Sequence, residues 1–389
     1  MNNPHVVPIL PSELVEEIIS RLPVKTLMQL ISVSKSWKSL IIDDPKFAKL
    51  HLKNSPKKTH FIINFEDEID YIDVDTCFIS CSVQRFLKEP SSTVDEGKCY
   101  RLKGTNSVVG SCNGLVCLGN FYDVALIKEF WVQLWNPVMR LSSKKSPTLK
   151  INSQTEEFGP CDKMNYGFGY DDSHDAYKVV VVFWNCTEQK METMVHCMGD
   201  SCWRKKSSDP NFPLLLKQVN GQFVGGCLNW LALDKVNDLN YQWNNVTLKN
   251  LVIVSFDMRD EIYKFISLPE GVRDVPHVEP DLGILGNHMC LFHHSKRAEI
   301  VVWQMREYGV QKSWTQLVRI GYQDPQCDDS VLRPLSMCLS EDGDFLLLTY
   351  AAGVVIFMCK LRDNSVEYTE LPDKDWLSIS SYVPSLIAP

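Results

Sequence analysis

Residues 10–37, LPSELVEEIISRLPVKTLMQLISVSKSW, decide the fold of the first part of this chain. Leu14, Ile18 and Leu22 recur every four residues, which predicts an amphipathic helix with one apolar face. Pro23 ends this helix, because proline lacks a backbone N–H and its ring clashes inside a helix. Two more apolar runs follow in the same stretch, so the sequence predicts three short helices.

The third helix groups Val33, Trp37 and Leu40, and Asp43-Asp44-Pro45 ends it. Three helices in about forty residues are close to the lower limit for independent stability. Each is apolar over more surface than so small a bundle can bury internally. Two interpretations fit this pattern: a module completed by a partner protein's helices, and a helical cap on the rest of the chain.

Two leucine–proline pairs, Leu10-Pro11 and Leu22-Pro23, frame the first helix, and Val33-Ser-Lys-x-Trp37 follows. With these strings, residues 5–52 resemble the F-box motif. The resemblance implies a helical hook that packs against a Skp-type adaptor, which in turn binds a cullin. It implies an adaptor-binding surface made of Leu10, Pro11, Leu14, Ile18, Leu22, Pro23, Val24, Lys25 and Leu27. It also implies that Val33, Trp37 and Leu40 form the structural core of the F-box.

Residues 53–60 are polar and contain a proline, which is typical of a linker. After them the hydrophobic period changes to two. Short segments rich in β-branched and aromatic residues alternate with Gly, Asn, Asp and Pro. The sequence therefore predicts a small all-α domain followed by an all-β domain over residues 61–385.

A loose repeat runs through the all-β region. Trp135, Phe256, Trp303 and Phe357 each end an apolar strand, at gaps of 121, 47 and 54 residues. The first gap is about two units, and Val195-His-Cys197 supplies a candidate for the missing copy. A period of about 50 residues matches a four-stranded blade of a kelch-like β-propeller. We expect about six blades.

Several longer strings carry a second resemblance, from about residue 100 to 320. They are Gly110-Ser-Cys-Asn-Gly-Leu-Val-Cys, Trp135-Asn-Pro, Tyr166-Gly-Phe-Gly-Tyr-Asp, Tyr177-Lys-Val-Val, Ser201-Cys-Trp-Arg, Val301-Val-Trp and Ser313-Trp-Thr. In order and spacing they resemble the F-box-associated (type 1) domain of the large plant F-box/kelch-like family. The double glycine of true kelch repeats occurs only once, at Gly225-Gly226, so the repeats depart from kelch.

Signatures of catalysis are missing from the sequence. There is no P-loop, no G-x-G-x-x-G, no G-x-S-x-G elbow and no His or Cys spacing typical of a metal site. We therefore expect no catalytic residue, no cofactor and no metal. An oxidase or hydrolase site at the mouth of the propeller is kept as a remote alternative.

Charge and cysteine content restrict the partners and the compartment. The formal net charge is −8, which disfavours a nucleic-acid partner. The 14 cysteines form no C-x-x-C pair, which favours a reducing compartment, the cytoplasm, the nucleus or both. Neither a signal peptide nor an apolar stretch of membrane-spanning length is recognisable, so no membrane association is expected.

Together these features predict the substrate-recognition subunit of an SCF-type (Skp–cullin–F-box) E3 ubiquitin ligase, itself without enzymatic activity. The β-domain would bind a target protein of unknown identity. Trp243 and Tyr241 in the polar loop 234–249 are candidate target contacts, as is the charged loop 321–332. The alternative is an F-box protein that acts outside a cullin complex as a non-degradative binding module.

Overall fold

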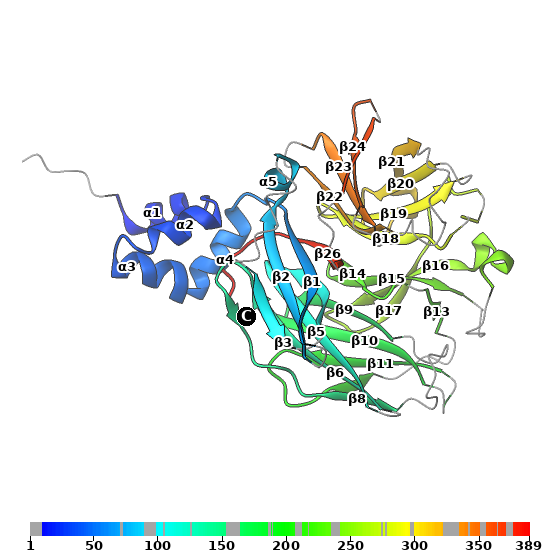
Figure 1. The fold of residues 1–389 in the computed structure, drawn as a ribbon, viewed down its shortest axis with the longest axis horizontal. Coiled ribbons are helices and arrows are strands. Elements are labelled where there is room, and N and C mark those ends of the chain that lie inside the picture. The colour runs from blue at the N-terminus through cyan, green and yellow to red at the C-terminus, as the bar shows by residue number, and fades with distance from the viewer. Residues whose placement is uncertain are drawn as a thin grey trace, which may run out of the picture.

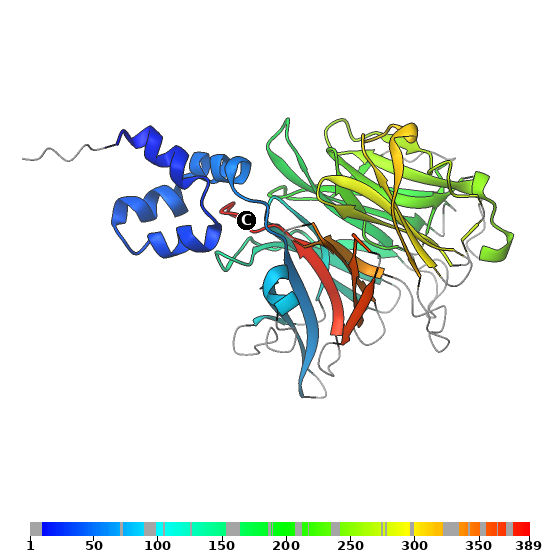
Figure 2. The same cartoon turned by 90° about the horizontal axis from the view of Figure 1, so that it is seen from above.

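A helical module and a ring of sheets lie side by side in the computed structural model of the chain (Figure 1), and a view turned by 90° shows the same division (Figure 2). The structure describes residues 10–70, 73–88, 99–103, 106–124, 127–152, 164–185, 188, 190–206, 212–216, 218–234, 242–273, 275–276, 278–295, 299–321, 334–340, 343–350, 355–363, 365–370 and 376–389.

The helical module consists of α1 (Ser12–Ile19), α2 (Val24–Leu30), α3 (Lys35–Lys38) with a π-helical turn η1 (Ser39–Asp43), and α4 (Pro45–Asn54). The first three correspond to the three predicted helices, and α4 was not predicted. Asp44 accepts hydrogen bonds from the amides of Lys46 (2.8 Å) and Phe47 (3.4 Å), and Pro45 occupies the first helical turn. The Asp-Pro pair that ends one helix therefore also begins the next.

Six antiparallel sheets follow, and each is a blade. Blade 1 contains β26 (Trp376–Tyr382), β1 (His60–Asp70), β2 (Asp73–Ser82) and β3 (Tyr100–Lys103). Blade 2 contains β4 (Asn106–Cys112), β5 (Leu115–Val124), β6 (Ile127–Asn136), β7 (Leu141–Ser142) and β8 (Leu149–Asn152). Blade 3 contains β9 (Met164–Asp171), β10 (Ala176–Asn185), β11 (Lys190–Cys197) and β12 (Arg204–Lys206).

Blade 4 contains β13 (Leu214–Leu215), β14 (Gln222–Val224), β15 (Cys227–Leu233), β16 (Leu251–Asp257) and β17 (Tyr263–Ile266). Blade 5 contains β18 (Asp281–Leu285), β19 (His288–Ser295), β20 (Glu299–Met305) and β21 (Trp314–Gly321). Blade 6 contains β22 (Pro334–Leu339), β23 (Phe345–Tyr350), β24 (Val355–Lys360) and β25 (Val366–Glu370). Outside the blades lie a short helix, α5 (Val83–Lys88), and the 3-10 turns η5 (Trp243–Asn245), η6 (Leu248–Asn250) and η7 (Gln311–Ser313).

The ring closes through both ends of the chain. Strands β26, β4, β9, β14, β18 and β22 are neighbours in this order around the axis, and β22 returns to β26. In blade 1, β26 pairs antiparallel with β1, and His60 lies opposite Tyr382. The fold is therefore a six-bladed β-propeller, which confirms the predicted architecture and blade number.

The four marker residues of the predicted repeat lie in the same strand of their respective blades. Trp135 lies in β6, Phe256 in β16, Trp303 in β20 and Phe357 in β24, and each of these is the third strand of its blade. The candidate missing copy, Val195-His-Cys197, ends β11, the third strand of blade 3. Its place confirms that the 121-residue gap contains a diverged blade.

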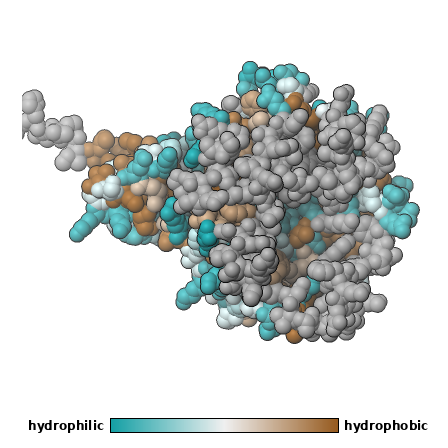
Figure 3. Space-filling model, in the orientation of Figure 1, coloured by the Kyte–Doolittle hydropathy of each residue, from teal (hydrophilic) through white to brown (hydrophobic). Residues whose placement is uncertain are grey.

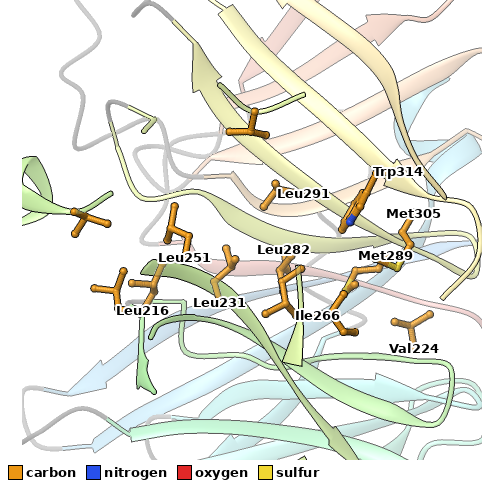
Figure 4. Close-up of a cluster of buried hydrophobic side chains, with 14 of the residues drawn as sticks. Leu216, Val224, Leu231, Leu251, Ile266, Leu282, Met289, Leu291, Met305 and Trp314 are labelled. Carbon is orange, nitrogen blue, oxygen red and sulfur yellow. The ribbon is translucent and has the colours of Figure 1, made fainter. Parts of the chain in front are cut away.

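Apolar side chains fill the spaces between neighbouring blades. Figure 4 shows the cluster between blades 4 and 5, where Leu231 and Leu251 come from one blade and Leu291 and Met305 from the next. Because strand residues alternate between the two faces of a sheet, β15 sends Leu231 to this cluster and Trp230 to the cluster between blades 3 and 4. None of the helices that the structure describes is long and apolar enough to cross a membrane.

Candidate protein-interaction surfaces

Part of the helical module presents apolar side chains to solvent. Leu14 and Ile18, one turn apart on α1, are 51% and 54% exposed, Leu10 just before the helix is 55% exposed, and Val33 after α2 is 64% exposed. We call these four residues the outer apolar face. Figure 3 shows hydrophobic residues gathered on this end of the molecule. Exposure of several large apolar side chains on one small module is typical of a protein-interaction site.

The predicted adaptor-binding set divides into two groups. Besides the residues of the outer apolar face, Pro11, Pro23 and Lys25 are exposed, and Leu22 is half-buried. Val24 and Leu27, however, are only 7% and 0% exposed, because they begin α2 on the side that faces the other helices. Their assignment to the contact surface was therefore wrong, and they support the surface from the core.

The predicted structural set needs one correction as well. Trp37 and Leu40 are half-buried and pack against the helical core, as expected. Val33 does not, because it lies in the turn between α2 and α3, where no other element covers it. Its exposed side chain belongs to the outer apolar face instead.

The core of the module is not made by its helices alone. Its buried members are Ile19, Val24, Leu27, Ile41, Phe47, Ala48 and Leu386, and the last comes from the C-terminal segment. At the edge of this core, His51 contacts the carbonyl oxygen of Leu22 through Nε2 at 3.0 Å. Burial lowers the pKa of His51, so its ring is neutral in the folded protein.

A buried charge network lies where blades 3 and 4 meet. The ammonium of Lys178 on β10 donates to Asp171 Oδ2 (2.9 Å), to Glu261 Oε1 (3.1 Å) and to a backbone carbonyl oxygen. Arg204 adds a second cation at 2.9 Å from Glu261. Burial alone would raise the pKa of Asp171, but the hydrogen bonds from Lys178 and His174 outweigh it and lower this pKa to about 2. The same holds for Glu261: burial would raise its pKa, but the hydrogen bonds from Arg204 and Lys178 outweigh burial and lower it.

One ion pair joins the helical module to the propeller. Lys49 on α4 lies 2.5 Å from Asp175 in the turn between β9 and β10, and both side chains are more than half exposed. The hydrogen bond from Lys49 is the main reason that the pKa of Asp175 is lowered. Because solvent screens this pair, it contributes little to holding the two parts together.

Strand direction places the β15–β16 connection on the opposite face. Turns that join first to second strands, and third to fourth strands, open on one face of a propeller, and the helical module contacts turns of this kind at Val138 and Asp175. The β15–β16 connection joins a second strand to a third, so it opens on the other face. In both views η5 and η6, in yellow-green, lie at the end farthest from the helices (Figures 1 and 2).

The candidate target-contact residues can be placed only in part. Trp243 is half-buried, packs against the cluster between blades 4 and 5, and donates its indole N–H to the carbonyl oxygen of Pro276 at 2.8 Å. Tyr241 and residues 322–332 lie outside the described residues. Beside η6 there is a cleft of about 340 Å³, and Asp234, Lys249 and Glu270 are the charged residues of its lining.

Two family models match the chain. Residues 8–49 match the F-box domain, and residues 60–389 match the F-box associated beta propeller domain. Helices α1 to α3 lie in the first range, α4 begins in it, and the six blades lie in the second. The chain therefore belongs to the F-box proteins that carry an F-box-associated β-propeller.

Individual relatives support this membership. The F-box/kelch-repeat protein At3g23880 of Arabidopsis thaliana is 31% identical over 360 residues, which cover 90% of this chain and 88% of the relative. F-box protein CPR1 of the same plant is 26% identical, with 84% of this chain and 76% of the relative covered. F-box protein At3g07870 is 23% identical, with 89% and 84% covered.

Proposed function

We propose that this protein is the target-recognition subunit of an SCF-type E3 ubiquitin ligase. Its outer apolar face binds a Skp-type adaptor and, through it, a cullin. The propeller holds the target protein, so that acceptor lysines of the target reach a high local concentration near the ubiquitin-conjugating enzyme. The protein itself carries out no bond chemistry, and it works in the cytoplasm, the nucleus or both.

The observation that carries this proposal is the exposure of Leu10, Leu14, Ile18 and Val33, each of which is more than half exposed. Covering these side chains with apolar helices of a partner removes them from water, at about 25 cal/mol for each Å². The neighbouring Lys25 is exposed and favours an acidic rim on the adaptor. The other interpretation, in which the helices only cap the rest of the chain, does not explain why these four side chains are exposed. The propeller and the C-terminal segment cover the opposite side of the module.

The geometry also favours a target site away from the adaptor. The β15–β16 connection opens on the propeller face opposite the helical module, and residues of this connection line the cleft beside η6. A target bound on that face leaves the adaptor surface free. Trp243 would then act mainly by holding this connection in shape, with its exposed edge available to the target.

Several acidic and histidine side chains of the propeller take part in structural bonds. Asp171 pairs with Lys178, and Glu192 pairs with Lys205 at 2.7 Å. His196 contacts the carbonyl oxygen of Cys202 at 3.2 Å. Among the described residues no group of three His, Cys, Asp or Glu could hold a metal ion.

The test is co-purification of the full chain with a Skp-type adaptor and a cullin. Leu14→Asp with Ile18→Asp places two carboxylates on the outer apolar face without disturbing the core, and we expect adaptor binding to be lost. The matched control is Leu141→Asp on β7, which is 44% exposed on the propeller and should bind normally. Full adaptor binding by the double variant would refute the proposal.

The same experiment separates the alternative function. Adaptor and cullin recovered together favour the ligase, whereas adaptor recovered without cullin favours a non-degradative F-box protein. Target candidates follow from proximity labelling under proteasome inhibition, performed with the normal protein and with the double variant. Proteins that both forms label, and that accumulate only with the double variant once the inhibitor is omitted, are the targets.

A further inference from the structure

Two of the strings that resemble the family hold the C-terminal segment. Asn136, from Trp135-Asn-Pro, is fully buried, and its Nδ2 donates to the carbonyl oxygens of Ser385 (3.1 Å) and Ile387 (2.8 Å). Its Oδ1 accepts from two amides of the following turn, Val138 (3.0 Å) and Met139 (3.1 Å). The side-chain amide of Asn136 therefore stabilises the β6–β7 turn and also binds the backbone of the C-terminal segment.

The second string, Gly110-Ser-Cys-Asn-Gly, acts from the β4–β5 turn. The hydroxyl of Ser385 donates to the carbonyl oxygen of Asn113 at 2.6 Å and accepts from the amide of Ile387 at 3.1 Å. Gly114 has a φ of +83°, and a Cβ there would lie 2.2 Å from Ser385 Oγ. Glycine is thus required at this position for two reasons: the positive φ of the backbone and the close approach of the C-terminal segment.

The side chains of the segment face two different cores. Leu386 is 1% exposed and packs inside the helical core with Ile19, Leu27 and Phe47. Ile387 packs against this core and also against the cluster between blades 2 and 3. In Figures 1 and 2 the C-terminus accordingly lies beside the helices.

We infer that residues 385–387 form a clasp that completes the F-box core and fixes the F-box on one face of the propeller. The clasp joins the two domains through buried apolar contacts and three hydrogen bonds, one buried and two partly buried, whereas the ion pair Lys49–Asp175 is exposed. The docking is a property of the chain alone. Its consequence, a fixed distance between adaptor and target, rests on the proposed function.

Hydrogen exchange of the full-length protein, without adaptor, tests the clasp. Asn136→Ala removes both donors to the segment, and we expect amide exchange in α1 and α4 to accelerate about tenfold or more. Leu386→Ala keeps the hydrogen bonds but empties the contact in the helical core, with the same expectation. Small-angle scattering should show a larger radius of gyration for both, because the F-box is no longer held.

Asn229→Ala is the matched control. Asn229 is a fully buried asparagine of blade 4 whose Nδ2 also donates to two carbonyl oxygens, those of Gln222 (3.0 Å) and Cys227 (3.2 Å). Its loss should accelerate exchange in blade 4 and leave α1 and α4 unchanged. Unchanged exchange in the helices of either folded clasp variant overturns the inference. Loss of adaptor binding in the Leu14→Asp, Ile18→Asp form has no bearing on this result.

Discussion

Replacing Lys178 with methionine separates the electrostatic role of the buried network from its packing role. Methionine keeps most of the length and apolar surface of lysine but removes the ammonium that donates to Asp171 and Glu261. The Asp171 side chain is fully buried, and its other side-chain partner, His174, lies 2.8 Å away and is exposed. Of the two carboxylates that Lys178 contacts, Asp171 therefore loses more stabilising interaction than Glu261.

The expected loss of stability is large. Removing one partner of a buried ion pair leaves an uncompensated buried charge, which costs about 3–5 kcal/mol at pH 7. Glu261 keeps Arg204 as a partner, so its share of the loss is the smaller one. We expect the free energy of unfolding to fall by about 3–5 kcal/mol in the variant.

The pH dependence gives the sharper test. In the normal protein the pKa of Asp171 is about 2, so its contribution to stability is present above the unfolded pKa of about 4 and is lost as the pH falls through 2. Without Lys178, burial raises this pKa, and protonation relieves the buried charge. The deficit of the variant should therefore shrink as the pH is lowered from 7 to about 4.

Urea unfolding followed by tryptophan fluorescence at pH 7 and pH 4.5 measures both effects. Lys264→Met is the control, because the ion pair of Lys264 with Asp257 leaves the ammonium in solvent and its loss should leave the midpoint nearly unchanged. A Lys178→Met protein within 1 kcal/mol of the normal one at pH 7 would contradict the reasoning. So would a deficit of equal size at both pH values.

Three further outcomes are expected. Gly114→Ala should destabilise the protein by about 1–3 kcal/mol more than Gly226→Ala in thermal unfolding, because both have positive φ but only the first meets Ser385. The unfolding temperature should fall as the pH drops below about 6.5, where unfolded histidines bind protons that buried His51 resists, and His51→Gln should reduce this dependence. Trp243→Ala should cost about 1–3 kcal/mol of stability, measured by urea unfolding; an unchanged midpoint would favour a purely target-facing role.

The helices and blades could be predicted because their signals are local. The spacing of Leu14 and Ile18 identifies α1, and the apolar strand ends at Trp135 and Trp303 give the repeat its period. The helix α4 also has a local signal, since Asp44-Pro45 is a typical capping residue followed by a first-turn proline. The prediction uses Asp44-Pro45 only to end the third helix, although the apolar residues that follow it are the signal of a fourth.

Other errors arose because burial depends on distant parts of the chain. Periodicity identifies which residues share a helix face but not what covers that face, and this is why Val24 and Leu27 were assigned to the surface and Val33 to the core. Leu386 and Ile387 belong to no periodic pattern. The side chains that they pack against lie far away in sequence, in the N-terminal helices and in blades 2 and 3. The resemblance marked Asn136 and Gly114 as a pattern without revealing that both hold this segment.

The pairing of β26 with β1 makes the last strand in sequence order the inner strand of the blade that begins first. During translation β1 is synthesised early, and the edge that pairs with β26 stays unpaired until more than three hundred further residues have been made. During that time the nascent domain is exposed to mispairing and to chaperones. A stop codon just before residue 376 would therefore do far more damage than its position suggests, since it leaves the ring permanently open and the F-box core without Leu386.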